Sequence, residues 1–168
     1  MPTDESLIAA VARGDDAALA ELTRRWERPL FQFIHRHTGG QDVDDLYQDT
    51  WLRVVRAAPR FDPARRFSTW LFQIALNLCR DHHRRPPPEP VDPADADAMA
   101  SGDASPDAAI DARRLLAALP EPQRSAVILR YYHDLAEDEI AEILGCPRGT
   151  VKSRLHHALR RLVEVARR

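Results

Sequence analysis

The chain has 168 residues, enough for one ordinary domain or two small ones and too few for a barrel-sized enzyme. Hydrophobic residues make up 44% and charged residues 30%, and no apolar run approaches the roughly 18 residues that span a membrane, which excludes a membrane protein. The net charge of −2 conceals strong segregation: residues 60–85 contain six arginines, residues 86–107 contain six acidic residues and no basic one, and residues 148–168 contain seven basic residues.

The composition favours an all-helical protein in the cytoplasm. The chain has 6 glycines and 13 prolines and is rich in alanine, leucine, arginine and glutamate, which suits helices interrupted at defined points. Its acidic N-terminus lacks the basic and then apolar order of a secretion signal. The two cysteines, Cys79 and Cys146, have no repeated ligand spacing around them. We therefore expect buried thiols, and neither a disulfide scaffold nor a zinc ribbon.

Residues 1–85 are expected to form one small helical domain, because apolar residues recur in four segments at three- and four-residue steps. The first segment stops at Gly14, the second ends at Gly39-Gly40, the third ends before Pro59 and the fourth runs into the prolines from residue 86. The expected N-terminal caps are Asp15 or Asp16 for the second helix and Ser68 or Thr69 for the fourth, and the third helix is expected to begin near Asp42 to Asp44.

Residues 86–107 are expected to form a flexible linker rich in proline and aspartate. They contain six prolines and six acidic residues, and their only larger apolar side chains are Val91 and Met99. Such an acidic segment is repelled by nucleic acid, or it covers a basic patch of the same chain. The fold class is therefore all-α, with two small helical domains on either side of a tether.

Residues 108–168 carry the pattern of a helix-turn-helix domain. We expect a helix over residues 110–119, a break at Pro120-Glu121-Pro122, a helix over residues 123–132, and then two helices joined by Gly145-Cys146-Pro147. A short glycine-bearing turn followed by a basic second helix is typical of the motif that places its second helix in the major groove of DNA.

The second helix of this motif is expected to turn a basic face outward. Its inward stripe is Val151, Leu155, Leu159 and Leu162, since these residues recur at helical spacing. The outward residues, with three flanking ones, form what we call the recognition face. Its side chains suit base edges and phosphates, although a solvated charged face is the alternative. The recognition face consists of Arg148, Gly149, Thr150, Lys152, Ser153, Arg154, His156, His157 and Arg160.

Two further surfaces stand out in residues 1–85. The third helix groups Asp44, Asp45, Gln48 and Asp49 along one side, with Leu46 and Leu52 nearby, which suits a basic protein partner or a solvated face. Residues 60–85 combine arginines with aromatic rings, a pattern that fits single-stranded nucleic acid. Core packing is the alternative for the rings, which are Phe61, Phe67, Trp70 and Phe72.

Three motifs in one order resemble the extracytoplasmic-function (ECF) sigma factors of bacteria. They are DDLYQDTWLRV at residues 44–54, FSTWLFQIALN at residues 67–77, and the segment from Leu119-Pro120 to GTVKSRL at residues 149–155. The resemblance covers nearly the whole chain outside the linker. It implies an initiation factor, not itself an enzyme, that uses no cofactor or metal, binds core RNA polymerase through its β′ clamp and β subunits, and directs it to promoter DNA.

The resemblance also assigns roles to residues. Residues 1–85 correspond to sigma region 2 and residues 108–168 to sigma region 4, and an anti-sigma factor usually regulates such proteins. The residues implied in polymerase binding are Asp44, Asp45, Gln48, Asp49 and Leu52. Those implied in binding the −10 element, around a base pocket near residues 62–67, are Arg60, Arg65, Arg66, Phe67, Trp70, Asn77, Arg80 and Arg84. Those implied in reading the −35 element are Arg148, Thr150, Lys152, Ser153, Arg154, His156, His157 and Arg160.

Departures from the family pattern and rival interpretations remain. Ala136 stands where the family usually has a serine that caps the first helix of the helix-turn-helix, and Gln73 where it often has arginine. A transcription regulator that binds duplex DNA without polymerase is one rival. A metal phosphoesterase built on Asp81-His82-His83 and a zinc site at His35 or His37 are others, though no strand-borne aspartate cluster accompanies these residues.

Overall fold

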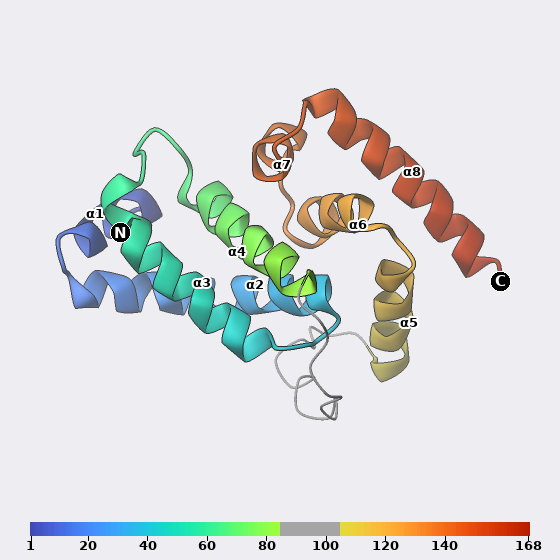
Figure 1. Ribbon diagram of the computed structural model, residues 1–168, viewed down its shortest axis with the longest axis horizontal. Helices are drawn as coiled ribbons and strands as arrows, with labels where there is room; N and C mark the ends of the chain where they lie inside the picture. Colours follow the sequence, from blue (N-terminus) through green and yellow to red (C-terminus); the bar gives the residue numbers. More distant parts are fainter. Residues whose placement is uncertain (85–104) are drawn as a thin grey trace.

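A computed structural model describes residues 1–84 and 105–168, and every regular element in them is helical (Figure 1). The expectation of an all-α fold is confirmed. The N-terminal domain consists of α1 (Asp4–Ala12), α2 (Asp16–Thr38), α3 (Val43–Ala57), a 3₁₀ turn η1 (Ala58–Arg60) and α4 (Phe67–His83). The C-terminal domain consists of α5 (Pro106–Ala117), α6 (Glu121–Val127), a π-helical continuation η3 (Ile128–Tyr132), α7 (Glu137–Leu144) and α8 (Arg148–Ala166).

Most of the predicted linker, with its proposed role of covering a basic patch, lies outside the described residues. Helix α5 begins at Pro106, two residues before the expected start of the second domain, and Ser105 caps it by accepting a hydrogen bond from the Ala108 N–H. No helix within residues 1–84 or 105–168 is both long enough and apolar enough to cross a membrane.

The N-terminal domain packs its four helices around one apolar core. Asp15 caps α2 by accepting from the Ala18 N–H, and Gly39 ends that helix at a φ of 68°, a left-handed conformation that glycine adopts without strain. The largest fully buried side chains come from α1, α2 and α4, so these helices cannot move independently of one another. They are Ile8, Leu22, Leu30, Phe33, Ile34, Phe67, Leu71, Phe72 and Leu76.

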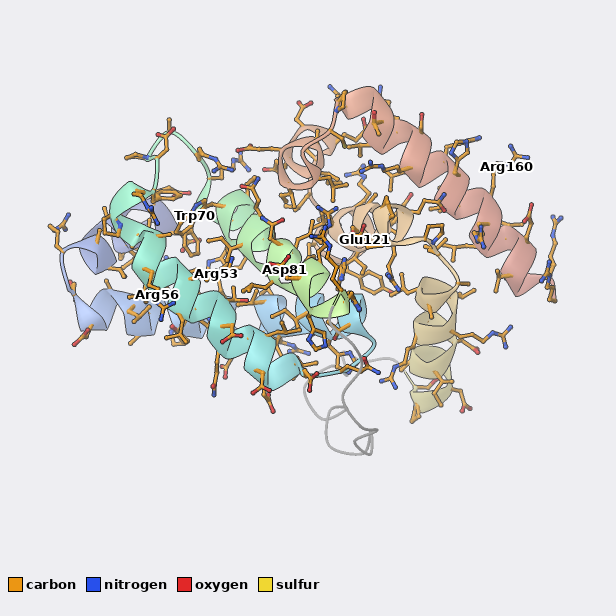
Figure 2. The ribbon with its side chains drawn as sticks, in the orientation of Figure 1. Arg53, Arg56, Trp70, Asp81, Glu121 and Arg160 are labelled. Atoms are coloured by element: carbon orange, nitrogen blue, oxygen red, sulfur yellow. The ribbon has the colours of Figure 1, made fainter. Side chains whose placement is uncertain are left out.

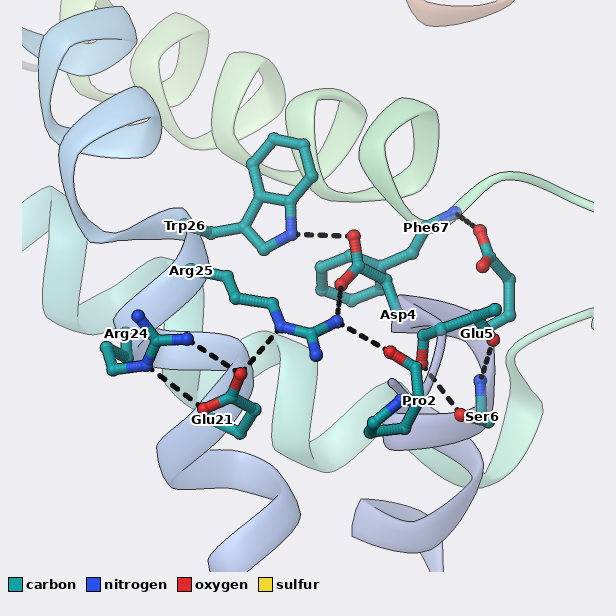
Figure 3. A network of polar contacts seen from close by, with 10 residues as sticks. Pro2, Asp4, Glu5, Ser6, Glu21, Arg24, Arg25, Trp26 and Phe67 are labelled. Atoms are coloured by element: carbon teal, nitrogen blue, oxygen red, sulfur yellow. Dashed lines mark hydrogen bonds and ion pairs between the residues drawn. The ribbon is translucent and has the colours of Figure 1, made fainter.

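The start of α4 differs from the expectation. Neither Ser68 nor Thr69 caps it; Arg66 occupies the cap position without a capping side chain, and Thr69 is buried inside the first turn. The cap comes instead from α1, because Glu5 Oε1 accepts a hydrogen bond of 2.9 Å from the Phe67 N–H (Figure 3). A carboxylate at the helix N-terminus satisfies an unpaired donor and suits the helix dipole.

Hydrogen bonds also connect helix α1 to α2 (Figure 3). Asp4 accepts hydrogen bonds from Arg25 Nη1 at 3.0 Å and from Trp26 Nε1 at 3.0 Å. Trp26 in turn packs edge-on against Phe67, with ring centroids 6.1 Å apart. The N-terminal helix therefore fixes both the loop before α4 and the first residue of that helix.

The C-terminal domain forms the expected helix-turn-helix, with two corrections. The expected break between α5 and α6 lies at residues 118–120, and α6 begins at Glu121, two residues before the expected start, taking Pro122 into its first turn, where the missing N–H has no helical partner to lose. In α8, Leu159 is 44% exposed and Ala158 takes the inward place, so only Val151 and Leu155 of the predicted stripe are buried. Gly145 adopts a φ of 65° at the turn between α7 and α8.

The two domains dock against each other. Helix α7 packs on α4, and η3 packs on α2. The ring of His133, from the C-terminal domain, packs against both Phe33 and Phe72, with centroids 5.8 Å and 4.8 Å away. Beside it, His37 Nε2 and Ser125 Oγ are 2.8 Å apart in a buried hydrogen bond across the interface. The interface therefore has a buried centre as well as polar edges.

Burial lowers the pKa of both interface histidines. For His133 it lowers the pKa to about 4, with Arg36 adding to the shift and Asp134 opposing it. For His37, burial also lowers the pKa, Arg124 and His83 act in the same direction, and Glu121 opposes it. Docking therefore favours the neutral rings.

Replacing Glu5 by alanine should destabilise the N-terminal domain, because the Phe67 N–H loses its partner. We expect a loss of about 1 kcal/mol of unfolding free energy, measured by thermal or urea denaturation, and a smaller loss for Glu5→Gln, which keeps an acceptor. Glu27→Ala, at an exposed site on α2, is the matched control. Glu5→Ala protein that unfolds with the control would contradict the capping role.

Docking should weaken as the pH falls from 7 to 5. Because the pKa of His133 falls to about 4 on docking, from 6.5, the undocked chain binds more protons in this range, and the docked form loses stability. The radius of gyration, measured by small-angle X-ray scattering, should rise. His133→Phe keeps an aromatic ring without a titrating group, so its response should be weaker; an identical response would rule out this origin.

Candidate nucleic-acid and protein interfaces

The acidic face of α3, formed by Asp44, Asp45, Gln48, Asp49 and Leu52, is fully on the surface. Leu52 is 54% exposed, an unusual position for a large apolar side chain. Leu46 does not join it, because it is buried in the core. Four polar side chains and one exposed leucine on one helix face suit a protein partner with basic and apolar groups. Figure 2 shows Arg53 and Arg56 further along the same helix.

The aromatic rings near α4 mainly serve the core. Phe67 and Phe72 are buried, so the implied contact of the Phe67 side chain with DNA is corrected: the ring supports the loop from inside. Trp70 is half-buried and meets Phe61 edge-on, with centroids 5.0 Å apart. These rings were open to either interpretation from sequence, because aromatic residues at helical spacing look the same in a core and in a stacking surface.

A stripe of α4 remains open to solvent. Trp70, Asn77 and Arg84 follow one another at seven-residue steps, which places them on nearly the same side of the helix. Asn77 and Arg84 are exposed, as is Arg60 in η1. The stripe offers an aromatic ring, an amide and a guanidinium group, which together can stack on a base, bond to its edge and pair with a phosphate.

Three other arginines of residues 60–84, namely Arg65, Arg66 and Arg80, pair with the C-terminal domain. Arg65 donates from Nε to Glu142 Oε1 at 2.8 Å and from Nη2 to Gln73 Oε1 at 2.9 Å. The Arg66 Nη1 atom lies 2.7 Å from Glu139 Oε1. The contacts with Glu142 and Glu139 join residues that are 77 and 73 positions apart in the sequence, so no local sequence pattern could have predicted them.

The third arginine pair is the most enclosed. Arg80 Nε donates to Glu121 Oε1 at 2.9 Å, and the same carboxylate accepts from Ser125 Oγ at 2.9 Å and lies 3.6 Å from His37 Nε2. The nearby His37 ring, and then the hydrogen bonds from Arg80 and Ser125, lower the pKa of Glu121 to about 2 against the opposing effect of burial. Figure 2 shows Glu121 at the start of α6, where this helix meets α4.

The recognition face of α8 lies largely on the surface. Lys152, Ser153, His156, His157 and Arg160 are exposed, while Thr150 and Arg154 are half-buried at its edges. Figure 2 shows Arg160 directed away from the body of the domain. Two of its basic residues, Arg148 and Lys152, have carboxylates of α7 close by. Glu137 Oε2 lies 3.2 Å from Arg148 Nε and 3.9 Å from Lys152 Nζ.

The residues behind the metal-site alternatives have other partners. His82 Nε2 lies 3.2 Å from Asp42 Oδ2, and His37 bonds to Ser125. Within the described parts of the chain, no three His, Cys, Asp or Glu side chains form a group that could hold a metal ion. Both cysteines are free; burial raises the pKa of the Cys79 thiol to about 12, while Cys146 is only partly buried, unlike the expectation.

Comparison with known proteins matches both domains and the chain as a whole. The family description Sigma-70 region 2 matches residues 22–86, and Sigma-70, region 4 matches residues 110–162. The ECF RNA polymerase sigma-E factor of Escherichia coli strain K12 is 32% identical over 172 residues, covering 93% of this chain and 90% of its own. The protein of the same description from Haemophilus influenzae is 30% identical over 178 residues, covering 96% and 94%.

Solved structures extend the match to the arrangement of the helices. CnrH, solved in complex with the cytosolic domain of CnrY, superimposes with a TM-score of 0.76 at 27% identity and covers 97% of this chain and 96% of its own. The sigma factor RpoE of Bartonella quintana, solved with the anti-sigma factor NepR, shares the fold with a TM-score of 0.66 at 23% identity, covering 88% and 97%.

The helix-turn-helix begins with half of a capping box. Ala136 is in the cap position of α7, with extended backbone angles, and its methyl group cannot accept a hydrogen bond. The reciprocal half is present, because Glu139 Oε2 accepts from the Ala136 N–H at 3.0 Å. The serine that the family pattern leads one to expect is therefore missing at a position where the backbone would accommodate it.

Replacing Ala136 by serine should stabilise the C-terminal domain. The hydroxyl would complete the capping box, and we expect a gain of about 0.5–1 kcal/mol in unfolding free energy, seen as a rise of a few degrees in melting temperature. Ala136→Val, which lacks an acceptor, should bring no gain. An unchanged melting temperature in the serine variant would mean that the cap is not vacant.

Proposed function

The chain belongs to the ECF RNA polymerase sigma factors, and we propose that its two helical domains divide the work of promoter recognition between them. Sigma factors bind core RNA polymerase and direct it to promoters. Residues 1–85 act as sigma region 2, which binds the polymerase and the −10 element. Residues 108–168 act as sigma region 4, which reads the −35 element. The matches over residues 22–86 and 110–162 support this division.

The acidic face of α3 is the proposed docking site for core polymerase, on the β′ clamp. Its carboxylates do not suit DNA, whose phosphates would repel them, and the exposed Leu52 supplies an apolar contact at one end of the charged surface. This exposed acidic face, on a chain whose other two surfaces are basic, is the observation that carries the proposal. A regulator that binds duplex DNA without polymerase would have no use for it.

The proposed −10 surface is the stripe Trp70, Asn77 and Arg84, with Arg60 nearby and Arg65, Arg66 and Arg80 beside it. Opening a duplex requires that an unpaired base finds a partner surface, and an aromatic ring, an amide and guanidinium groups provide stacking, edge bonding and phosphate pairing. Phe67 acts indirectly, since its buried ring supports the loop over residues 62–67.

The recognition face of α8 is the proposed reader of the −35 element. A helix of 19 residues fits the major groove, and its first turns carry Thr150, Lys152 and Ser153, which can reach base edges. Arg154, His156, His157 and Arg160 lie further along and suit bases or phosphates. Arg148 must leave Glu137 to join them, a small cost because this ion pair is exposed.

The protein would act in the cytoplasm, where polymerase works, and would contribute binding and strand opening without catalysing a reaction itself. We also propose an anti-sigma factor as its regulator. The complex of RpoE with the anti-sigma factor NepR supports this regulator, and CnrH, which matches this chain over nearly its full length, was likewise solved with a protein partner.

Run-off transcription with bacterial core polymerase on a library of promoter fragments tests the proposal. Specific start sites should appear only when the protein is added, and Asp45→Arg combined with Asp49→Arg should reduce them about tenfold or more, because like charges would then face a basic partner. Asp111→Arg combined with Glu164→Arg changes the charge equally at exposed sites of the C-terminal domain and should keep the start sites.

Two results would contradict this function. Wild-type protein that yields no start site, yet binds duplex DNA tightly alone, would favour the stand-alone regulator. If the Asp45→Arg, Asp49→Arg variant gave as much specific transcription as the control, the acidic face of α3 would not be the polymerase contact.

A further inference from the structure

We propose that two carboxylates of α7 set the selectivity with which the recognition face of α8 binds DNA. They belong to Glu137 and Asp138, and they pair with the two basic residues at the start of that face, Arg148 and Lys152. We call these four residues the entry cluster. This inference rests on the proposed function, because it takes α8 as the reader of the −35 element.

The entry cluster joins the first turn of α7 to the first turns of α8. Glu137 Oε2 lies 3.2 Å from Arg148 Nε and 3.9 Å from Lys152 Nζ. Asp138 Oδ1 lies 3.5 Å from Arg148 Nη1. The two basic side chains are 58% and 61% exposed, whereas that of Glu137 is 24% exposed, so Glu137 is the more enclosed partner in both of its pairs. Because α7 and α8 pack on each other across a turn of three residues, the motif itself brings the four charges together.

The positive charge of the recognition face lies in its later part. The formal charge of the entry cluster is zero, because two carboxylates face one guanidinium group and one ammonium group. Further along α8, the Arg154 guanidinium group contacts the Cys146 thiol at 3.6 Å, and Arg160 is exposed. These two arginines keep their charge for phosphates, while the start of α8 attracts phosphates weakly.

Phosphates and base edges respond differently to a neutral cluster. Phosphate oxygens only accept hydrogen bonds, so they attract the two cations of the entry cluster and are repelled by its two carboxylates. The edge of a G·C pair in the major groove offers acceptors at guanine O6 and N7 and a donor at cytosine N4, so both halves of the cluster find partners there. The entry cluster therefore favours a correct sequence by reducing the affinity that depends on charge alone.

The test variant combines Glu137→Gln with Asp138→Asn. It removes both negative charges and keeps amide oxygens that can accept from a base edge. Helix α7 should survive this change, because the side chain that accepts a hydrogen bond from the Ala136 N–H at its start belongs to Glu139. Glu137→Gln alone is a second variant, which keeps the Asp138 carboxylate at the helix N-terminus.

The matched control is Asp111→Asn combined with Glu164→Gln, which removes the same charge from two exposed sites. Glu164 lies near the far end of α8 (Arg148–Ala166), about 24 Å along the helix from its first residue. This distance exceeds the screening length of about 10 Å at 0.1 M salt, so the control does not alter the field at the entry cluster.

The first measurement uses the full chain and a fluorescein-labelled duplex of about 24 alternating A·T and T·A pairs, which offers phosphates but no G·C edge. Fluorescence anisotropy gives the affinity over a series of salt concentrations. The test variant should bind about three- to tenfold more tightly than the control at 0.1 M salt, and its plot of log affinity against log salt should be steeper by about 1 to 2. Glu137→Gln alone should give about half of this change. Loss of folding would weaken binding, so instability cannot imitate this result.

The second measurement uses core polymerase and the promoter fragment that gives the strongest start site. Run-off transcription from this fragment is compared with that from the same fragment with its −35 segment scrambled. The ratio of the two yields should fall about threefold or more in the test variant relative to the control, because the scrambled fragment gains most from the added charge.

Equal affinity and equal salt dependence in the test variant and the control would overturn the proposal, and so would a steeper salt dependence with an unchanged ratio of yields. Either result, together with start sites from the wild type, would leave the sigma-factor function intact. A steeper salt dependence in the test variant without start sites from any of these proteins would support the neutralising role of the carboxylates and contradict the sigma-factor function.

Discussion

The contact between α4 and the C-terminal domain is the constraint on which the rest of the molecule depends. Arg80, Glu121 and His37 join three helices of two domains around one carboxylate. The Glu121 carboxylate is half-buried, so part of its hydration is replaced by donors, and here two side chains donate to it beside the imidazole ring. The same helix, α4, carries the exposed stripe proposed to meet the −10 element. One helix thus serves both the free and the DNA-bound protein.

The sequence predicted the helices well where local signals decide them. Asp15, Gly39 and Gly145 act at helix ends through short-range hydrogen bonds or backbone freedom, and each was found from its neighbours alone. The start of α4 was missed because its cap, Glu5, comes from a helix 62 residues earlier. Leu159 was misplaced because the inward stripe of α8 steps from Leu155 to Ala158, three residues on, so that Leu159 lies beside the stripe.

The candidate surfaces divide in the same way. The acidic face of α3 and the recognition face of α8 each lie on one helix, so periodicity alone placed most of their residues on the surface. The arginines of residues 60–84 look alike in sequence, yet Arg65, Arg66 and Arg80 face carboxylates of the C-terminal domain, while Arg84 lies near Asp81 of its own domain. Only the tertiary structure separates these two groups, because the carboxylates of the C-terminal domain follow the linker.

The most direct measurement of this account is the distance between α4 and α8 in the free protein and in its complex with core polymerase and promoter DNA. Spin labels on cysteines introduced at Asp81 and Glu164, in a chain with Cys146 replaced by serine, would report it by pulsed electron paramagnetic resonance. We expect one short distance between the labels at Asp81 and Glu164 in the free chain, and an increase of several tens of ångströms in the complex, on the order of the promoter spacing. An unchanged distance would contradict it.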